Sequence, residues 1–221
     1  MTVRFRFSTP VRDLLSAVSN LLLIAGAGAI GVYVWSQGDQ WLYQSVQRNH
    51  FERLSTAPTA EPAHEEPPAD ATSGRVAALG LPLVRWMEPD PHVIGVIEIP
   101  RLGIDALIRE GTETRTLRRS VGHVPGTAIP GSPGNAVLAA HRDTLFRGLR
   151  HVERGDRILI RRRGDPDPVT YEVTSIRIVG PDSVEVMAPN DSAVLTLVTC
   201  YPFEFVGHAD RRFVVRANAI Y

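Results

Sequence analysis

The chain has 221 residues, enough for one or two domains. Its 24 basic and 24 acidic residues balance, so it lacks the basic excess that binds nucleic acid. Every basic residue other than histidine is arginine, which excludes enzymes that need a Schiff-base or P-loop lysine. The single cysteine, Cys200, excludes an internal disulfide and metal sites built from paired thiolates.

Residues 14–38 form an uncharged, largely apolar stretch, long enough to span a bilayer. Ala25, Gly26 and Ala27 have the small-x-small form of a signal-peptide cleavage site, so a cleaved leader is the alternative. Because apolar sequence continues past this point, we favour an uncleaved transmembrane helix.

The charges around the apolar stretch predict its orientation. Arg4, Arg6 and Arg12 precede it, whereas Asp39 follows it and the next basic residue is Arg48. By the positive-inside rule the N-terminus is cytoplasmic. We therefore predict a single-pass protein of the cell membrane with an extracytoplasmic C-terminal domain.

Composition divides the chain into three parts. Residues 1–38 are the predicted cytoplasmic tail and anchor, residues 39–91 a juxtamembrane stalk or linker, and residues 92–221 a folded domain. Within the linker, residues 40–54 allow a short polar helix, while residues 55–74 are rich in proline, alanine and acidic residues and have little to bury. Such a composition predicts a flexible stalk.

The domain from residue 92 onward has an all-β pattern. Short runs rich in Val, Ile and Thr alternate with Gly, Pro and Asp, and this texture predicts a closed barrel or a sandwich. Two short helices fit residues 112–120 and 144–152, and Asp143 is a candidate cap for the second. The expected strands are residues 93–99, 104–109, 136–140, 156–162, 169–179, 193–199 and 212–219.

Three polar side chains lie at predicted strand ends. Cys200 closes a run that alternates with period two, His141 follows the run 136–140, and Arg212 opens the last strand. Acyl transfer by cysteine needs a nucleophile, a proton carrier and a donor aimed at the developing oxyanion. Cysteine, histidine and arginine supply one of each, although spacing alone does not bring them together.

Cys200 ends the segment Thr-Leu-Val-Thr-Cys at residues 196–200. This segment is similar to the TLxTC signature of the sortases, membrane-anchored cysteine transpeptidases of bacterial surfaces. Residues 122–127, 130–131 and 134–144 are similar to the segments around the family's histidine, and residues 95–102 to its first strand. The continuation at residues 200–203 and residues 206–210 look most like class D sortases or their Gram-negative relatives.

The resemblance implies a role for each of the three strand-end residues. Cys200 becomes the nucleophile and His141 the general acid/base. Arg212 becomes the guanidinium that holds substrate and stabilises the oxyanion, because residues 212–216 match the family's final Arg-x-x-x-Arg pattern. Arg211 is the rival for this role. Thr199, His123 and Asp143 are candidate substrate-binding residues, with strand packing, a structural role and helix capping as the respective alternatives. Capping is favoured for Asp143.

The resemblance also implies an eight-stranded sortase barrel and a defined pair of substrates. The donor is a secreted protein with a C-terminal Leu-Pro-x-Thr-Gly-like sorting signal, and the acceptor is an amine of the cell wall or of a surface protein. No metal or other cofactor is expected. Two alternatives stay open: a thiol protease that hydrolyses the same signal, and a non-catalytic β domain that binds such peptides.

Overall fold

The computed structural model describes residues 9–56, 88–204 and 207–221, which divide into two units, Met1–Trp41 and Leu42–Tyr221. The first unit consists of the beginning of helix α1 (Thr9–Thr56). Its large apolar side chains, such as those of residues 21–24, are exposed. The stretch Ser16–Arg53 contains a segment long and apolar enough to cross a membrane. Residues 57–87, which include most of the predicted flexible stalk, lie outside the described residues, and the boundaries at 38 and 91 stay predictions. The polar helix expected at residues 40–54 is present as the last part of α1.

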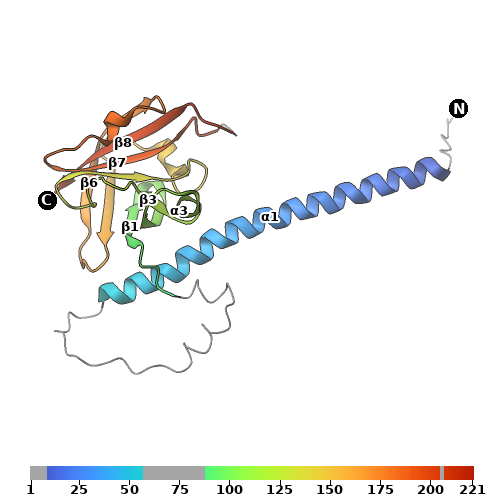
Figure 1. The fold of residues 1–221 in the computed structure, drawn as a ribbon, viewed down its shortest axis with the longest axis horizontal. Coiled ribbons are helices and arrows are strands. Elements are labelled where there is room, and N and C mark those ends of the chain that lie inside the picture. The colour runs from blue at the N-terminus through green and yellow to red at the C-terminus, as the bar shows by residue number, and fades with distance from the viewer. Residues whose placement is uncertain (1–8, 57–87, 205–206) are drawn as a thin grey trace, which may run out of the picture. The chain divides into compact units, whose positions relative to one another are not determined.

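The second unit contains a closed β-barrel, as predicted (Figure 1). Its eight strands follow the order β1-β2-β3-β4-β7-β8-β6-β5. The predicted strands are confirmed with small shifts at their ends, and the structure adds the three-residue strand β3. The strands are β1 (Val93–Ile99), β2 (Ile104–Glu110), β3 (Val121–His123), β4 (Gly134–Ala139), β5 (Arg157–Arg162), β6 (Val169–Val179), β7 (Ala193–Tyr201) and β8 (Arg211–Ile220).

Strand alternation explains the barrel core. Ile97 and Ile99 of β1 and their partners Ala106 and Ile104 of β2 all point inward and are buried. Leu195 of β7 does the same on the far wall. Because side chains alternate between the two faces of a strand, the residues between these lie on the outer face of the barrel. The active-site candidates and the contacts of α1 both use that outer face.

Strand β3 was missed because it is short and contains a glycine. Gly122 lies so close to the Gly111 carbonyl oxygen that an added Cβ would be 2.5 Å from it. A glycine is therefore required there, although glycine weakens any sequence-based prediction of a strand. The short helix α3 (Thr114–Arg119) lies within the expected range of residues 112–120.

The second predicted helix is only partly present. Residues 142–146 form turns, and a 3-10 helix, η3 (Arg147–His151), follows. Phe146 occupies its N-cap and no side chain caps it, so the capping role favoured for Asp143 is wrong. The other 3-10 helices are η2 (Pro100–Leu102) and η4 (Val184–Met187).

Candidate active site

The strand register brings the three strand-end residues into one row across β4, β7 and β8. β4 and β7 are parallel with Ala139 opposite Val198, so continuing two residues aligns His141 with Cys200. β7 and β8 are antiparallel, and there Cys200 is the direct partner of Arg212. Parallel strands end at the same edge of a sheet, which is why segments far apart in sequence meet here.

Cys200 lies on the outer face of β7, near the end of the strand. Leu195 and Leu197 point into the core. Because side chains alternate along the strand, Cys200 lies on the opposite face and points out of the barrel. It is a free thiol with intermediate exposure. This position makes it accessible to a peptide lying on the barrel wall.

A hydrogen bond between neighbouring strands holds His141 beside β7. The Thr199 hydroxyl donates to the Ala140 carbonyl oxygen at 2.7 Å, and the Ala140 N–H donates to the Val198 carbonyl oxygen at 3.4 Å. These bonds fix the backbone directly before His141, whose own side chain is exposed. Thr199 thus positions the histidine segment in the structure, and its direct contact with substrate stays a prediction.

Arg212 is held by carbonyl groups at the start of β8. Its Nη1 donates to the Ala209 and Arg211 carbonyl oxygens, each at 3.0 Å. Arg211, the rival candidate, is the cross-strand partner of Tyr201, so its side chain lies on the opposite face of β8 from that of Arg212. Register therefore favours Arg212 as the guanidinium that shares a face with the thiol.

Cys200 and His141 line a single cavity of about 610 Å³. Three arginines and two acidic side chains surround it, so its charge is on balance positive. A cavity of about 640 Å³ near η2 and η3 contains neither Cys200 nor His141, so chemistry rather than volume identifies the site. Arg212 does not line the cavity and adjoins Cys200 through strand pairing. The lining residues are His141, Arg142, Asp143, Arg147, Arg150, Cys200, Phe203, Glu204 and Gly207.

Two further predicted substrate-binding residues are in different surroundings. Asp143 is exposed and lines the cavity beside His141. His123 is buried, with Nδ1 2.7 Å from Glu110 Oε2 and Nε2 2.9 Å from the Ala128 carbonyl oxygen. These contacts hold the imidazole ring of His123 within the fold. Contact of either residue with substrate stays a prediction.

Sequence reasoning missed the arginines that line the cavity. Arg142 is buried and its Nη2 donates to the Gly207 carbonyl oxygen at 2.8 Å, which ties the histidine segment to the β7–β8 loop. Arg150 lies on η3 with its guanidinium 5.9 Å from the centroid of the Phe203 ring. Arg142 directly follows His141 in the sequence, and this is the one signal that pointed to it. Among the described residues there is no cluster of three or more His, Cys, Asp or Glu side chains that could hold a metal ion.

A family model described as a sortase domain matches residues 97–220, more than half of the chain. The chain belongs to the sortase family. This sortase is 36% identical over 128 residues to Sortase D of Bacillus subtilis (strain 168), covering 57% of this chain and 63% of the relative. It is 33% identical over 136 residues to Sortase A of Streptococcus agalactiae serotype III (strain NEM316), covering 57% of this chain and 52% of the relative. The chain thus spans less than two thirds of the length of either relative.

Solved sortase structures are similar to this chain in fold. A Sortase D5 transpeptidase of Clostridium perfringens superposes with a TM-score of 0.59 at 24% identity, covering 80% of this chain and all of the other, and that likeness concerns the fold alone. Sortase A from Corynebacterium diphtheriae gives a TM-score of 0.55 at 28% identity, over 80% of this chain and 82% of the other. The Sortase D relative confirms the expected class D-like character.

Proposed function

We propose that this sortase is a membrane-anchored cysteine transpeptidase that cleaves a Leu-Pro-x-Thr-Gly-like signal after threonine and transfers the protein to a surface amine. The observation that carries the proposal is the alignment of His141, Cys200 and Arg212 across three adjacent strands. One nucleophile, one proton carrier and one guanidinium lie side by side on the outer face of the barrel. That is the set which acyl transfer by a thiol requires.

In the first half of the reaction, the Cys200 thiolate attacks the threonine carbonyl carbon. A tetrahedral oxyanion forms, and the guanidinium of Arg212 donates to it. His141 gives its proton to the leaving amine, so the peptide bond breaks and a thioester to Cys200 remains. The carbonyls of Ala209 and Arg211 hold Arg212 in place for this step.

In the second half, an acceptor amine attacks the thioester. His141, neutral after the first half, takes the proton that the amine loses, and the Cys200 thiolate leaves. The new amide joins the secreted protein to the acceptor and the enzyme returns to its starting state. Every proton and electron pair is supplied by substrates and by these residues, so the scheme uses no cofactor.

The apolar helix supports the membrane part of the proposal. A segment within Ser16–Arg53 is long and apolar enough to span a bilayer, and the arginines before it favour a cytoplasmic N-terminus. The barrel then faces the outside, where secreted proteins with C-terminal signals and surface amines meet. A cell-surface sortase acts on substrates of this class.

Hydrolysis is the second candidate function, because water can also resolve a thioester. Exposure of the catalytic face favours it: His141 is exposed and Cys200 is half-buried. An amine acceptor must therefore compete with water at the same thioester, and the ratio of the two products measures which function dominates.

The test uses the full chain in detergent with a Leu-Pro-x-Thr-Gly peptide library and a small amine, with products identified by mass spectrometry. Transpeptidation predicts cleavage after threonine with amine capture, absent in Cys200→Ala. Hydrolysis with no captured amine would favour the thiol protease. Peptide binding without cleavage, unchanged in Cys200→Ala, would contradict both enzymes and leave the peptide-binding domain.

A further inference from the structure

The outer face of β1 and β2 is covered by a segment of α1 that belongs to the same compact unit as the barrel. Val96 and Leu107 are cross-strand partners that point outward, yet they are 1% and 0% exposed. An outward side chain on a barrel wall stays buried only when another element covers it. Here the cover is residues 43–52 of α1, which we call the helix clamp.

The apolar part of this contact is a small core of its own. Tyr43 and Phe51 of the helix clamp pack on Val93, Val96 and Leu107, in a cluster separate from the barrel interior. Phe51 is 2% exposed. The guanidinium of Arg161 on β5 lies 5.6 Å from the centroid of its ring, so β5 borders the contact as well.

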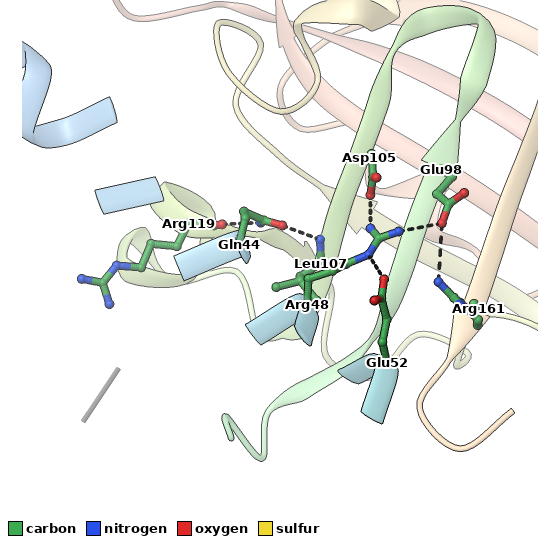
Figure 2. A network of polar contacts seen from close by, with 8 residues as sticks. All are labelled: Gln44, Arg48, Glu52, Glu98, Asp105, Leu107, Arg119 and Arg161. Carbon is green, nitrogen blue, oxygen red and sulfur yellow. Dashed lines mark hydrogen bonds and ion pairs between the residues drawn. The ribbon is translucent and has the colours of Figure 1, made fainter. Parts of the chain in front are cut away.

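Arg48 forms the charged part of the contact (Figure 2). Glu98 of β1 and Asp105 of β2 are cross-strand partners, so their carboxylates lie side by side on the outer face. Like charges in this arrangement repel. Arg48 offsets the repulsion by binding both, with Nη2 2.9 Å from Glu98 Oε1 and Nη1 on Asp105 Oδ1, while its Nε contacts Glu52 of the helix clamp.

Two glutamines add hydrogen bonds to the barrel backbone. Gln44 accepts from the Leu107 N–H at 2.9 Å and donates to the Arg119 carbonyl oxygen at 2.6 Å (Figure 2). Gln47 likewise accepts from the Asp90 N–H and donates to the Glu88 carbonyl oxygen, both at 2.8 Å. Each side-chain amide donates one hydrogen bond and accepts another. Together these bonds fix the rotation of the helix about its axis and its position along that axis. The contact is therefore specific as well as apolar.

We propose that the helix clamp holds the catalytic barrel by itself, independently of the covalent connection through residues 57–87, and leaves the catalytic wall uncovered. Around the closed barrel, β7 lies four strands from β1 in either direction, so Cys200 is on the wall opposite the helix clamp. Only residues 39–42 separate the apolar stretch from the helix clamp. The barrel is then linked to the apolar stretch by these few residues, and the length of the connection through residues 57–87 does not change that link.

The experiment uses the full chain in detergent, with an affinity tag at the N-terminus and a protease recognition site introduced within residues 57–87. After complete cleavage, the barrel fragment is measured on and off the resin. The wild-type barrel is expected to stay bound. Phe51→Asp places a charge in the apolar contact and should lower the retained fraction at least about tenfold. Asn49→Asp adds the same charge at an exposed position of the helix clamp and should leave retention unchanged.

A charge exchange separates loss of docking from loss of folding. Arg48→Asp should release the barrel, and adding Asp105→Arg should restore retention, a rescue that unfolding does not give. Released barrels should keep a β-type circular dichroism spectrum. Release of the wild-type barrel after cleavage would overturn the proposal, as would equal retention of Phe51→Asp and wild type. If Phe51→Asp unfolds the barrel, the charge exchange decides. None of these readouts depends on peptide cleavage, so they test the helix clamp separately from the proposed activity.

Discussion

The β4/β7/β8 wall and the β1/β2/β5 wall of the barrel follow the same strand alternation but use their outer faces differently. On the first wall, Cys200 and His141 remain accessible beside a cavity. On the second, Val96 and Leu107 are buried under a helix. Inward residues build the barrel in both cases, so the difference resides entirely in the outward residues. The comparison predicts that substitutions on the first wall change peptide cleavage with little effect on stability. Substitutions on the second wall should change stability with little effect on peptide cleavage.

The largest expected effect is on the catalytic wall. Cys200→Ala should lower peptide cleavage by about 10⁴-fold or more, because the residual rate then lacks a nucleophile. The free energy of unfolding should change by only about 0.5 kcal/mol, as for a half-exposed position. Peptide cleavage by mass spectrometry and thermal unfolding measure the two quantities. A large fall in stability would contradict the division between the walls.

A smaller loss of activity is expected from Arg212→Ala. Removing one donor to an oxyanion typically costs about 10²- to 10³-fold in kcat. Arg211→Ala is the matched control, since Arg211 is the adjacent arginine of opposite parity on the same strand. Steady-state kinetics of the two variants compare them directly. A larger loss in Arg211→Ala would transfer the guanidinium role to Arg211.

On the covered wall, Phe51→Ala should weaken docking of the helix clamp by about 3 kcal/mol, the usual cost of removing a buried aromatic side chain. Thermal unfolding should report the loss, with Asn49→Ala as the exposed control on the same helix. The kcat for a soluble peptide should stay near the wild-type value. Should kcat fall together with stability, the two walls would be coupled.

The smallest expected effect is on the dependence of stability on acid pH. A hydrogen bond from Arg101 is the main cause that lowers the pKa of Asp156, with burial opposing it. For Asp90 burial is the largest influence and would raise the pKa, but the His92 N–H, the Tyr43 hydroxyl and Arg109 outweigh it and lower the pKa.

Both carboxyl groups therefore bind protons more weakly in the folded than in the unfolded chain. Their stabilisation is present above the unfolded pKa of about 4 and is lost as the pH falls through the lower folded pKa. Denaturant unfolding below about pH 4 should show a shallower fall in stability for Asp156→Asn than for wild type. Asp182→Asn, at an exposed loop position, should keep the wild-type slope. Equal slopes for all three proteins would contradict the assigned role of Asp156.

Sequence patterns predicted the barrel and the candidate residues of its active site because both depend on local signals. Period-two alternation located the strands, and the Thr-Leu-Val-Thr-Cys and Ala-Ala-His segments located Cys200 and His141. Contacts between segments distant in sequence had no such signal. No pattern in the sequence linked Arg48 of the predicted polar helix to Glu98 and Asp105 of two predicted strands, and the structure places the cation between the two carboxylates.

The parallel pairing of β4 with β7 also affects the order in which the protein matures. The hydrogen bond from Thr199 to Ala140 joins positions 59 residues apart, and the antiparallel partner of Cys200 comes later still. Pairings of such long sequence separation form slowly, after local hairpins such as β1 with β2. A molecule caught partway through folding thus carries its thiol apart from the imidazole and the guanidinium. Completion of the barrel is therefore the step that brings the thiol, the imidazole and the guanidinium together.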